Sequence, residues 1–365
     1  MVKLTNSKIL ITGGAGFIGS NLVDYFLSNG HEVVVLDNLS TGFENNLKKH
    51  FRNKNFSFIE GDIRNLNTCR QAVTGCDLVS HQAALGSVPR SLQDPGTTNE
   101  VNISGFLNML IAARDEHIRR FVYAASSSTY GDSKKLPKIE DEIGKPLSPY
   151  AVTKYVNELY ADVFAKSYGM QCIGLRYFNV FGKRQNPDGA YAAVIPIWMK
   201  HLLNHESPVI NGDGSYSRDF TYIANVVHAN EMALFASDES ILDGQREYYN
   251  LGLEDHKYLK SSEVIQKRAP ETVPAEFYFS EVVNIAYGGN ITLTQLYGLI
   301  QEILGQNDEE IHRIEPIHGK PRVGDIPHSE ASIRKAQLLL NYDPQYSVEQ
   351  GLKKCVEWYR DLLLS

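Results

Sequence analysis

The 365-residue chain is 42% hydrophobic and 22% charged, the composition of a globular protein with room for a large core and a second lobe. Its formal net charge of −7 disfavours nucleic acid and anionic membrane surfaces as partners. Because no apolar stretch reaches the length of a membrane span and the first residues lack a signal-peptide pattern, we expect a cytoplasmic protein with no membrane partner.

The four cysteines, Cys69, Cys76, Cys172 and Cys355, are scattered along the chain. Their spacing fits neither a disulfide framework nor a zinc site. Of the eleven histidines, only His201 and His205 stand at HxxxH spacing, and no cysteine or further histidine lies near that pair in the sequence. We therefore expect no metal site.

The first predicted unit is a strand, a glycine turn and a helix. Ile9–Ile11 is a short, β-branched, apolar run that suits a strand buried on both faces, and Phe17–Ser28 carries apolar residues at helical spacing. Gly14 and Gly16 lie between them and Gly19 in the first turn of the helix, where a tight turn needs residues without a Cβ. Such a turn presents the N-terminus of the helix to a pyrophosphate. Taken alone, the pattern also fits an ordinary glycine-rich connection.

The second predicted strand, His31–Leu36, ends at Asp37. A carboxylate at this strand end accepts hydrogen bonds from both hydroxyls of an adenosine ribose and repels a 2′-phosphate, so its position favours NAD over NADP. The alternative role of Asp37 is that of a turn former.

Further strands and helices alternate along the first half of the chain, which predicts a Rossmann-type, doubly wound parallel sheet covered on both faces. Ligands bind beyond the carboxyl ends of the strands in such sheets. The expected strands are Phe56–Ile59, Asp77–His81, Phe121–Ala125 and Gln171–Arg176, and the expected helices are Asn67–Val73, Thr97–His117 and Pro149–Tyr168.

The alternation fades after about residue 180, where a smaller C-terminal, substrate-binding lobe is expected. Residues 1–180 would form the NAD-binding domain, with returning segments at about 218–241 and 282–288, and 181–365 the remainder. Within that remainder we expect a helix at Tyr191–Asn204, a short strand and turn at Val209–Gly214, and a buried strand at Val282–Ala286. Asp238–Phe277 has no sustained period and is interpreted as a surface excursion.

Ser148-Pro149 is a helix start, and it places Tyr150 and Lys154 on one helix face. A nearby ammonium favours the phenolate, so we expect the pKa of Tyr150 to lie well below 10 and the phenol to act as a base. Ser126, at a strand end directed toward the same crevice, can hydrogen-bond a substrate oxygen. The alternatives without a catalytic role are an amphipathic helix on which Tyr150 and Lys154 stack, and a polar strand end at Ser126.

Together these residues resemble the extended short-chain dehydrogenase/reductase superfamily. The resemblance runs over nearly the whole chain and is strongest to nucleotide-sugar 4-epimerases. The motifs that carry it are the glycine turn Gly13–Gly19, Asp62-Ile63, His81-Gln82-Ala83-Ala84, Ser126 with Tyr150 and Lys154, and Arg176-Tyr177-Phe178-Asn179.

The resemblance implies a tightly held NAD that is recycled in each turnover. Tyr150 would remove the proton from the sugar 4-hydroxyl, Ser126 would relay or steady it, and Lys154 would hold the nicotinamide ribose and lower the pKa of the phenol. The hydride would pass to NAD⁺, leaving a 4-keto sugar that turns and takes the hydride back on its other face.

It also implies the residues of the site. Asn179 and Arg218 would contact the substrate diphosphate and Arg322 would clamp it, although Arg218 has the alternative of a surface ion pair with Asp219. The expected cofactor residues are Gly13, Gly16, Phe17, Ile18, Gly19, Asp37, Asn38, Ser40, Thr41, Gly42, Asp62, Ile63, Gln82, Ala83, Ala84, Asn102, Tyr150, Lys154 and Tyr177. The expected substrate residues are Gly86, Ser87, Ser126, Ser127, Asn179, Ala193, Val194, Arg218, Arg322 and Ser329.

The resemblance narrows the substrate. Sugar dehydratases of the superfamily carry an acidic pair where this chain has Ser127 and Ser128, and the position that gates the sugar 2-substituent is Ser329, which leaves room for an N-acetyl group. With Gly86–Arg90, these features favour interconversion of UDP-N-acetylglucosamine and UDP-N-acetylgalactosamine. The alternative substrates are UDP-N-acetylglucosaminuronate and UDP-glucose. A different class is a non-catalytic NAD-binding protein.

Two expectations concern the rest of the molecule. The segment 244–281 is longer than this subgroup usually has and is treated as an insertion. The helices Thr97–His117 and Pro149–Tyr168 have a second apolar face, which in the family forms a four-helix contact, so a homodimer is expected.

Overall fold

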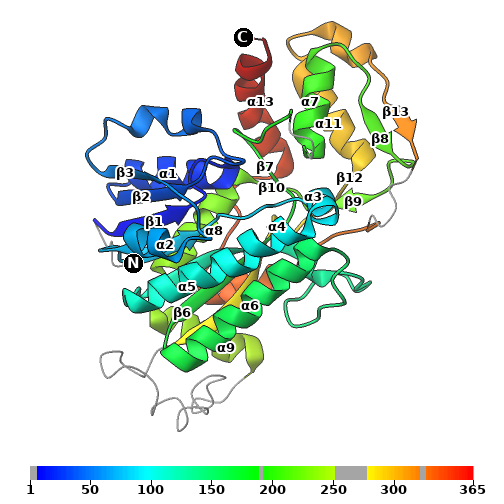
Figure 1. Cartoon of the computed structure of the whole chain (residues 1–365). Helices are drawn as coiled ribbons and strands as arrows, with labels where there is room; N and C mark the ends of the chain where they lie inside the picture. The colour runs from blue at the N-terminus through cyan, green and yellow to red at the C-terminus, as the bar shows by residue number, and fades with distance from the viewer. Residues whose placement is uncertain (1–5, 189–191, 251–277, 321–325, 365) are drawn as a thin grey trace.

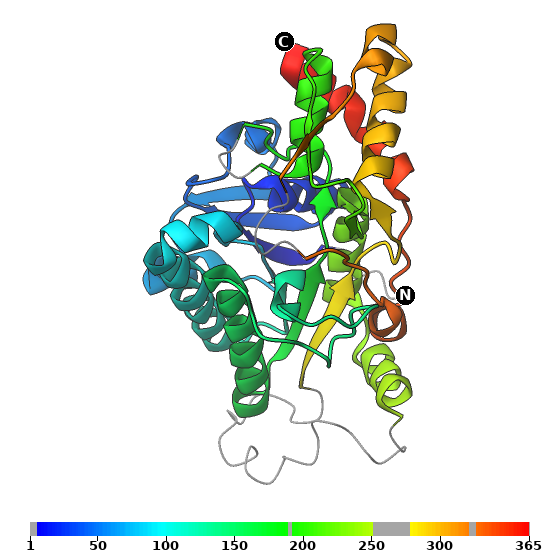
Figure 2. The same ribbon diagram turned by 90° about the vertical axis from the view of Figure 1, so that its right-hand side faces the viewer.

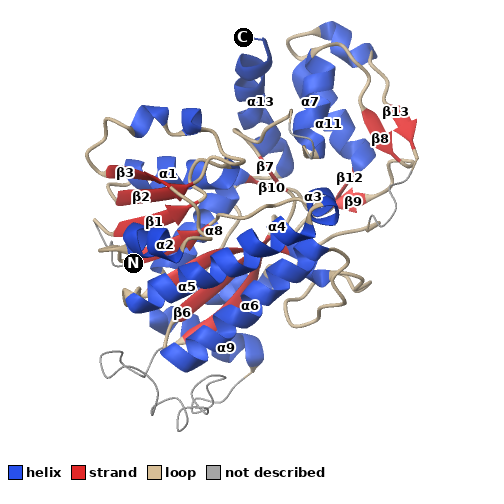
Figure 3. Ribbon diagram, viewed as in Figure 1, coloured by secondary structure: helices blue, strands red, loops and turns tan. Residues whose placement is uncertain are grey.

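The computed structural model describes residues 6–188, 192–250, 278–320 and 326–364. Its centre is a sheet in the order β11-β6-β5-β4-β1-β2-β3, in which every neighbouring pair is parallel (Figure 3). The expected α/β, doubly wound fold is confirmed. The strands are β1 Lys8–Thr12, β2 Glu32–Asp37, β3 Phe56–Glu60, β4 Leu78–His81, β5 Arg120–Ser126, β6 Gln171–Tyr177 and β11 Phe279–Ile285.

Helices cover both faces of this sheet, as the apolar strands require (Figure 1). Ile9 and Ile11 pack into one core cluster, while Leu10 packs into the other, so β1 is buried on both sides. Each fully buried side chain of this kind stabilises the fold by about 1.5–3 kcal/mol. One face carries α1 Phe17–Ser28 and α8 Ile223–Phe235, and the other carries α2 Leu66–Val73, α5 Phe106–Asp115 and α6 Pro149–Tyr168.

The six strands and the helices expected in the first 180 residues are all present, with one helix divided. The expected helix Thr97–His117 consists of α4 Pro95–Asn99, a π-helical turn η3 Glu100–Gly105 and then α5. The wide turn directs Asn102 into the protein, where its side chain bonds the backbone of Leu85. A short helix before it, α3 Val88–Gln93, was not expected.

The second lobe lies above the sheet in both views (Figures 1 and 2). The expected helix is α7 Val194–Leu203 and the expected strand β8 Val209–Asn211, and the Trp198 indole N–H donates to the Val209 carbonyl at 3.0 Å. The helices packed beside α7, which the sequence did not predict, are α11 Leu293–Gly305 and α13 Val348–Leu364. Short pairs complete the lobe: β7 Val180–Phe181 with β10 Thr221–Tyr222, β9 Ser217–Arg218 with β12 Ile291–Thr292, and β8 with β13 Ile317–Gly319.

The interpretation of Asp238–Phe277 as a surface excursion is wrong for its first part. Asp238–Tyr249 is the helix α9, which is capped by Ser237 and packs against α12 Arg334–Leu340. The interface is polar, because Gln245 donates to Glu281, which pairs with Lys335 at 2.7 Å. A helix that buries polar groups shows little apolar periodicity. Residues 251–277, which include most of the expected insertion, lie outside the described residues.

Candidate active site

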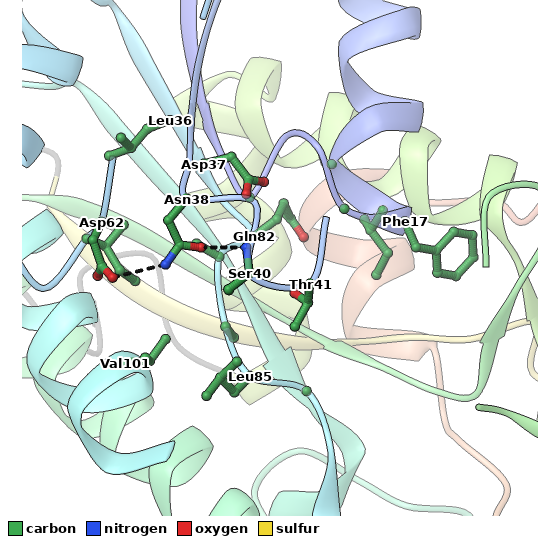
Figure 4. A pocket seen from close by; sticks show the side chains of 18 of the residues that line it. Phe17, Leu36, Asp37, Asn38, Ser40, Thr41, Asp62, Gln82, Leu85 and Val101 are labelled. Carbon is green, nitrogen blue, oxygen red and sulfur yellow. Dashed lines mark hydrogen bonds between the residues drawn. The ribbon is translucent and has the colours of Figure 1, made fainter. Parts of the chain in front are cut away.

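A cavity of about 340 Å³ opens at the carboxyl ends of β1 to β4, beside the point where the strand order reverses (Figure 4). Most of the residues expected to hold the cofactor line it: Gly13, Gly16, Phe17, Ile18, Gly19, Asp37, Asn38, Ser40, Thr41, Asp62, Ile63, Gln82, Ala83 and Ala84. Gly86, expected to contact substrate, lies there too. The sequence did not identify Leu36, Gly61, Leu85 and Val101; the first two directly adjoin Asp37 and Asp62, whereas Val101 depends on the π-helical turn.

The glycine turn leaves no space for side chains. Gly13 has a φ of 69°, and a Cβ there would lie 2.8 Å from the Ala83 backbone; a Cβ at Gly19 would lie 2.1 Å from the Gly13 carbonyl oxygen. Gly16 is the N-cap of α1 and provides no side-chain cap. The first N–H groups of the helix therefore face the cavity, as a pyrophosphate site requires.

Asp37 points toward this turn (Figure 4). Its Oδ2 accepts from the Ala15 N–H at 2.9 Å, and its Oδ1 accepts from the Leu39 N–H at 2.8 Å. Burial raises the pKa of the Asp37 carboxyl, and the two backbone bonds oppose that shift. A carboxylate at this place accepts ribose hydroxyls and repels a 2′-phosphate, so the cradle fits NAD.

Asp62 closes the far wall of the cavity. Its Oδ2 accepts from the Asn38 amide at 3.0 Å, and the Asn38 Oδ1 accepts from the Ser40 N–H at 3.1 Å (Figure 4). The Arg64 guanidinium beside Asp62 is the main reason that its pKa falls to about 2. Asp62 is therefore ionised near neutral pH and holds the loop that follows β2.

Five expected cofactor residues do not line the cavity. Tyr150 and Lys154 lie where β5 ends and α6 begins, and the contacts of the other three support the cavity walls. Gly42 packs on the glycine turn, since a Cβ there would lie 2.8 Å from the Ala15 carbonyl carbon. Asn102 donates to the Thr153 hydroxyl of α6 at 3.1 Å and bonds both backbone groups of Leu85. Tyr177 is buried in β6.

Tyr177 belongs to a closed ring of four side chains behind the cavity. The Tyr177 hydroxyl donates to the Gln82 Oε1 at 3.1 Å and accepts from the Asn230 amide at 2.9 Å. The Gln82 Nε2 donates to Ser80 and to the Asn230 Oδ1, at 2.9 and 3.1 Å. The ring fixes the Gln82 side chain in the cavity wall. Asn230 lies on α8, distant in sequence, and only its place as a polar residue in an apolar helix could have signalled it.

The three expected catalytic residues converge where β5 ends and α6 begins. The Tyr150 phenol and the Ser126 hydroxyl are hydrogen-bonded. The Lys154 Nζ lies 6.0 Å from the centre of the Tyr150 ring and donates to the Ala124 carbonyl at 2.7 Å. The helix start that presents Tyr150 is fixed by Ser148, whose hydroxyl accepts from the Ala151 N–H. Asn102 links this turn to the cavity wall at Leu85.

The expected lowering of the Tyr150 pKa is wrong for the protein alone. Burial raises the pKa of the phenol, and the hydrogen bond with Ser126 only partly opposes this. Burial also lowers the pKa of the Lys154 ammonium to about 8. Both shifts arise because a water-poor site disfavours charge, and the Lys154 ammonium is directed to Ala124.

The other expected substrate residues that the structure describes lie on separate elements. The Ser87 hydroxyl caps α3, Ala193 is the N-cap of α7 before Val194, and Ser127 begins the turn that follows β5. The Ser329 N–H donates to the Ser217 carbonyl beside Arg218. Arg322 lies outside the described residues.

The side chains of Arg218 and Asn179 both donate hydrogen bonds to backbone carbonyl groups. The Arg218 guanidinium donates to the carbonyls of Ser217 and Pro327, at 2.9 and 3.1 Å. The Asn179 amide donates to the Asp219 carbonyl at 3.0 Å. The Asp219 carboxylate accepts from backbone N–H groups and is buried, so it is not a surface partner for Arg218.

In the part of the chain described, no three His, Cys, Asp or Glu side chains gather as a metal site would require, and the four cysteines are buried free thiols. Among the described helices, none combines the length and apolar character needed to cross a bilayer.

Comparison with known proteins gives a consistent result. Residues 9–252 match the sequence model of the NAD dependent epimerase/dehydratase family. The chain is 31% identical over 356 residues to the UDP-glucose 4-epimerase of Mycolicibacterium smegmatis, covering 97% of this chain and 99% of that protein.

Two solved structures superpose on nearly the whole chain. UDP-N-acetylglucosamine 4-epimerase from Methanobrevibacter ruminantium M1, in complex with UDP-N-acetylmuramic acid, has a TM-score of 0.81 at 32% identity and covers 98% of this chain and 100% of that one. UDP-glucuronic acid 4-epimerase from Bacillus cereus, with UDP-glucuronic acid and NAD, has a TM-score of 0.77 at 28% identity and covers 97% and 99%.

Proposed function

The chain belongs to the NAD dependent epimerase/dehydratase family as an NAD-dependent UDP-sugar 4-epimerase, and we propose that its substrate pair is UDP-N-acetylglucosamine and UDP-N-acetylgalactosamine. The observation that carries the chemistry is the meeting of Tyr150, Ser126 and Lys154 where β5 ends and α6 begins, on a helix that Asn102 links to the cavity wall at Leu85.

Tyr150 takes the proton of the sugar 4-hydroxyl and later returns it, and Ser126 steadies the same oxygen through its hydroxyl. Lys154 has three N–H donors, of which the bond to Ala124 uses one, so its ammonium can also hold a ribose hydroxyl. When bound, NAD supplies the redox chemistry by accepting the C4 hydride and giving it back. Positive charge beside the phenol then favours the phenolate, opposing the effect of burial.

The preference for an N-acetyl group rests on small side chains. Ser329 is half-buried and sits beside Arg218 through the bond from its N–H to Ser217. Ser127 and Ser128 follow Ser126 where a dehydratase would need acidic groups, which favours epimerisation over dehydration but does not bear on the 2-substituent. The similarity to the Methanobrevibacter ruminantium enzyme, a UDP-N-acetylglucosamine 4-epimerase, supports the same substrate.

The outer face of α6 supports a homodimer. Val152, Leu159 and Val163 lie on one side of the helix with side chains 45%, 50% and 53% exposed. Leu92 of α3 is 64% exposed. Apolar side chains gathered on helix faces mark association surfaces, and two copies of such helices form a bundle.

The test is a panel of UDP-N-acetylglucosamine, UDP-glucose and UDP-N-acetylglucosaminuronate with the NAD-loaded protein, each product being identified by chromatography. We expect the highest kcat/KM on UDP-N-acetylglucosamine. A higher kcat/KM on either other sugar would replace the proposed substrate by that sugar. Retained NAD with no product from any of the three would instead support a non-catalytic NAD-binding role.

A further inference from the structure

Asp219 is a carboxylate at the seam between the sheet and the second lobe, and it is only 1% exposed. It directly follows β9, which pairs with β12 below α11 (Figure 1). Its Oδ1 accepts from the Tyr287 N–H and its Oδ2 from the Gly288 N–H, both at 3.1 Å. Its Oδ2 also lies 3.4 Å from the Ala331 N–H.

These contacts join segments that are far apart in sequence. The turn after β11 contributes Tyr287 and Gly288, and the segment that carries Ser329 contributes Ala331. The Asp219 carbonyl accepts from the Asn179 side chain, and the Thr221 N–H donates to the Asn179 carbonyl at 3.2 Å. One residue thus connects the surroundings of Asn179, Arg218 and Ser329.

We propose that Asp219 is a positioning residue for the UDP-sugar, which fixes the relative placement of Asn179, Arg218 and Ser329 without itself contacting the substrate. The inference rests on the proposed function, since those three residues are the ones expected to meet the diphosphate and the sugar. A carboxylate suits this role because both oxygens accept hydrogen bonds and neither donates.

The ionised form is the one that can accept from every surrounding N–H. Protonation would turn one oxygen into a donor facing backbone donors. Burial raises the pKa of Asp219 to about 7, against the bonds from Ala331, Tyr287 and Gly288. Binding of the UDP-sugar should therefore weaken as the pH falls from 8 to 6.

Other ionisable groups surround this position and must be separated from it. Arg218 precedes it, the Tyr342 hydroxyl donates to the Ala286 carbonyl beside it, and Tyr287 provides one of its donors. Glu330 is adjacent to Ala331, and His328 is paired with the Ser217 hydroxyl at 2.8 Å. Imidazoles commonly titrate between pH 5 and 8, so His328 needs its own variant.

The experiment measures the Kd of UDP-N-acetylglucosamine by calorimetry in NAD-loaded protein carrying Tyr150→Phe, which prevents turnover during the titration. Asp219→Asn should raise this Kd on the order of tenfold, because an amide N–H₂ replaces one acceptor. With Tyr150 restored, Asp219→Asn should raise KM by a similar factor and leave kcat and NAD content within about twofold. Asp213→Asn is the matched control, since its exposed carboxylate bonds Ser215 in the same loop.

A change in kcat or NAD content without a change in Kd would overturn the inference, as would an unchanged Kd in Asp219→Asn. If Asp219→Asn does not fold, the pH profile decides: the Kd with the Tyr150→Phe protein should rise between pH 8 and 6, and it should still rise in His328→Asn. A flat profile, or one abolished by His328→Asn, would refute the role of Asp219. Failure of the protein with native Asp219 to bind any UDP-sugar would instead refute the proposed function.

Discussion

The Arg176 guanidinium grips the Glu158 carboxylate at two points, with the Nε 2.9 Å from Oε1 and an Nη 2.8 Å from Oε2. Both side chains are at most 6% exposed, and the pair fastens β6 to the helix that carries Tyr150 and Lys154. Paired guanidinium and carboxylate groups of this geometry are strong and directional.

Glu158→Gln should destabilise the fold by about 3–5 kcal/mol, because it leaves the Arg176 charge buried without its partner. The measurement is urea unfolding. Glu349→Gln, which breaks the exposed pair with Lys353, is the control and should change the free energy of unfolding by less than about 1 kcal/mol. Equal small effects would mean that the buried pair is dispensable.

Tyr150→Phe should lower kcat by at least about 100-fold while NAD content stays unchanged, since only the phenolic oxygen is lost. Product formation and the NAD released on denaturation measure the two effects. Tyr160→Phe, on the same helix, should retain activity. A near-native rate in Tyr150→Phe would show that another group acts as the base.

Ser329→Tyr should reduce kcat/KM for UDP-N-acetylglucosamine at least about tenfold more than for UDP-glucose, because the larger ring fills the space left for the N-acetyl group. Ser329→Ala removes only a hydroxyl and should preserve the preference. A parallel loss on both sugars in Ser329→Tyr would remove Ser329 from the basis of selectivity.

Because His81 is buried, we expect the free energy of unfolding to decrease as the pH falls. His81 lies at the end of β4 with its Nδ1 2.9 Å from the Thr12 hydroxyl, and burial lowers its pKa to about 3. An unfolded histidine titrates near 6.5, so between these values the unfolded chain binds more protons and stability falls as the pH drops. From pH 6.5 to 5 this single group should remove about 2 kcal/mol.

Urea unfolding at the two pH values, with His81→Gln, measures this contribution. The variant should lose that part of the pH dependence, whereas His312→Gln, at an exposed site, should keep it. The raised pKa of Asp219 has the opposite effect on stability. Between about pH 4 and 7 the folded protein keeps a proton on Asp219 that the unfolded chain has lost, so stability falls as the pH rises through this range. If His81→Gln keeps the whole pH dependence, the acid sensitivity lies elsewhere.

Leu159→Lys should dissociate the proposed homodimer, since it places a charge in the middle of the apolar face of α6. Sedimentation velocity at micromolar concentration measures the change. Ile317→Lys, at an equally exposed apolar position on β13, should leave the sedimentation coefficient unaltered. A monomer already in the unaltered protein would contradict the dimer.

The sequence was sufficient where local chemistry decides the structure. Ile9, Leu10 and Ile11 form the expected strand buried on both faces, and Gly14 and Gly19, two of the three glycines expected in the tight turn, have no room for a Cβ. The same turn and Asp37 predicted most of the cavity wall.

Features created by contacts between distant segments could not be predicted in this way. Asn230 reaches Gln82 only because α8 packs beneath β4, and α9 buries Gln245 against Glu281 instead of an apolar stripe. The direction of the Tyr150 pKa depends on how deeply the phenol is enclosed, which a spacing of four residues from Lys154 does not determine.

The bonding of Asp37 has a consequence for attempts to re-engineer the coenzyme. Both of its oxygens accept hydrogen bonds from backbone N–H groups, at Ala15 and Leu39. The carboxylate therefore stabilises the conformation of the phosphate-binding loop as well as favouring an unphosphorylated ribose. Exchanging Asp37 for a neutral residue would remove these two hydrogen bonds and destabilise the loop, and it would not by itself give good binding of NADP. A variant that uses NADP well therefore needs substitutions that restore both anchors in addition to a new cation for the extra phosphate.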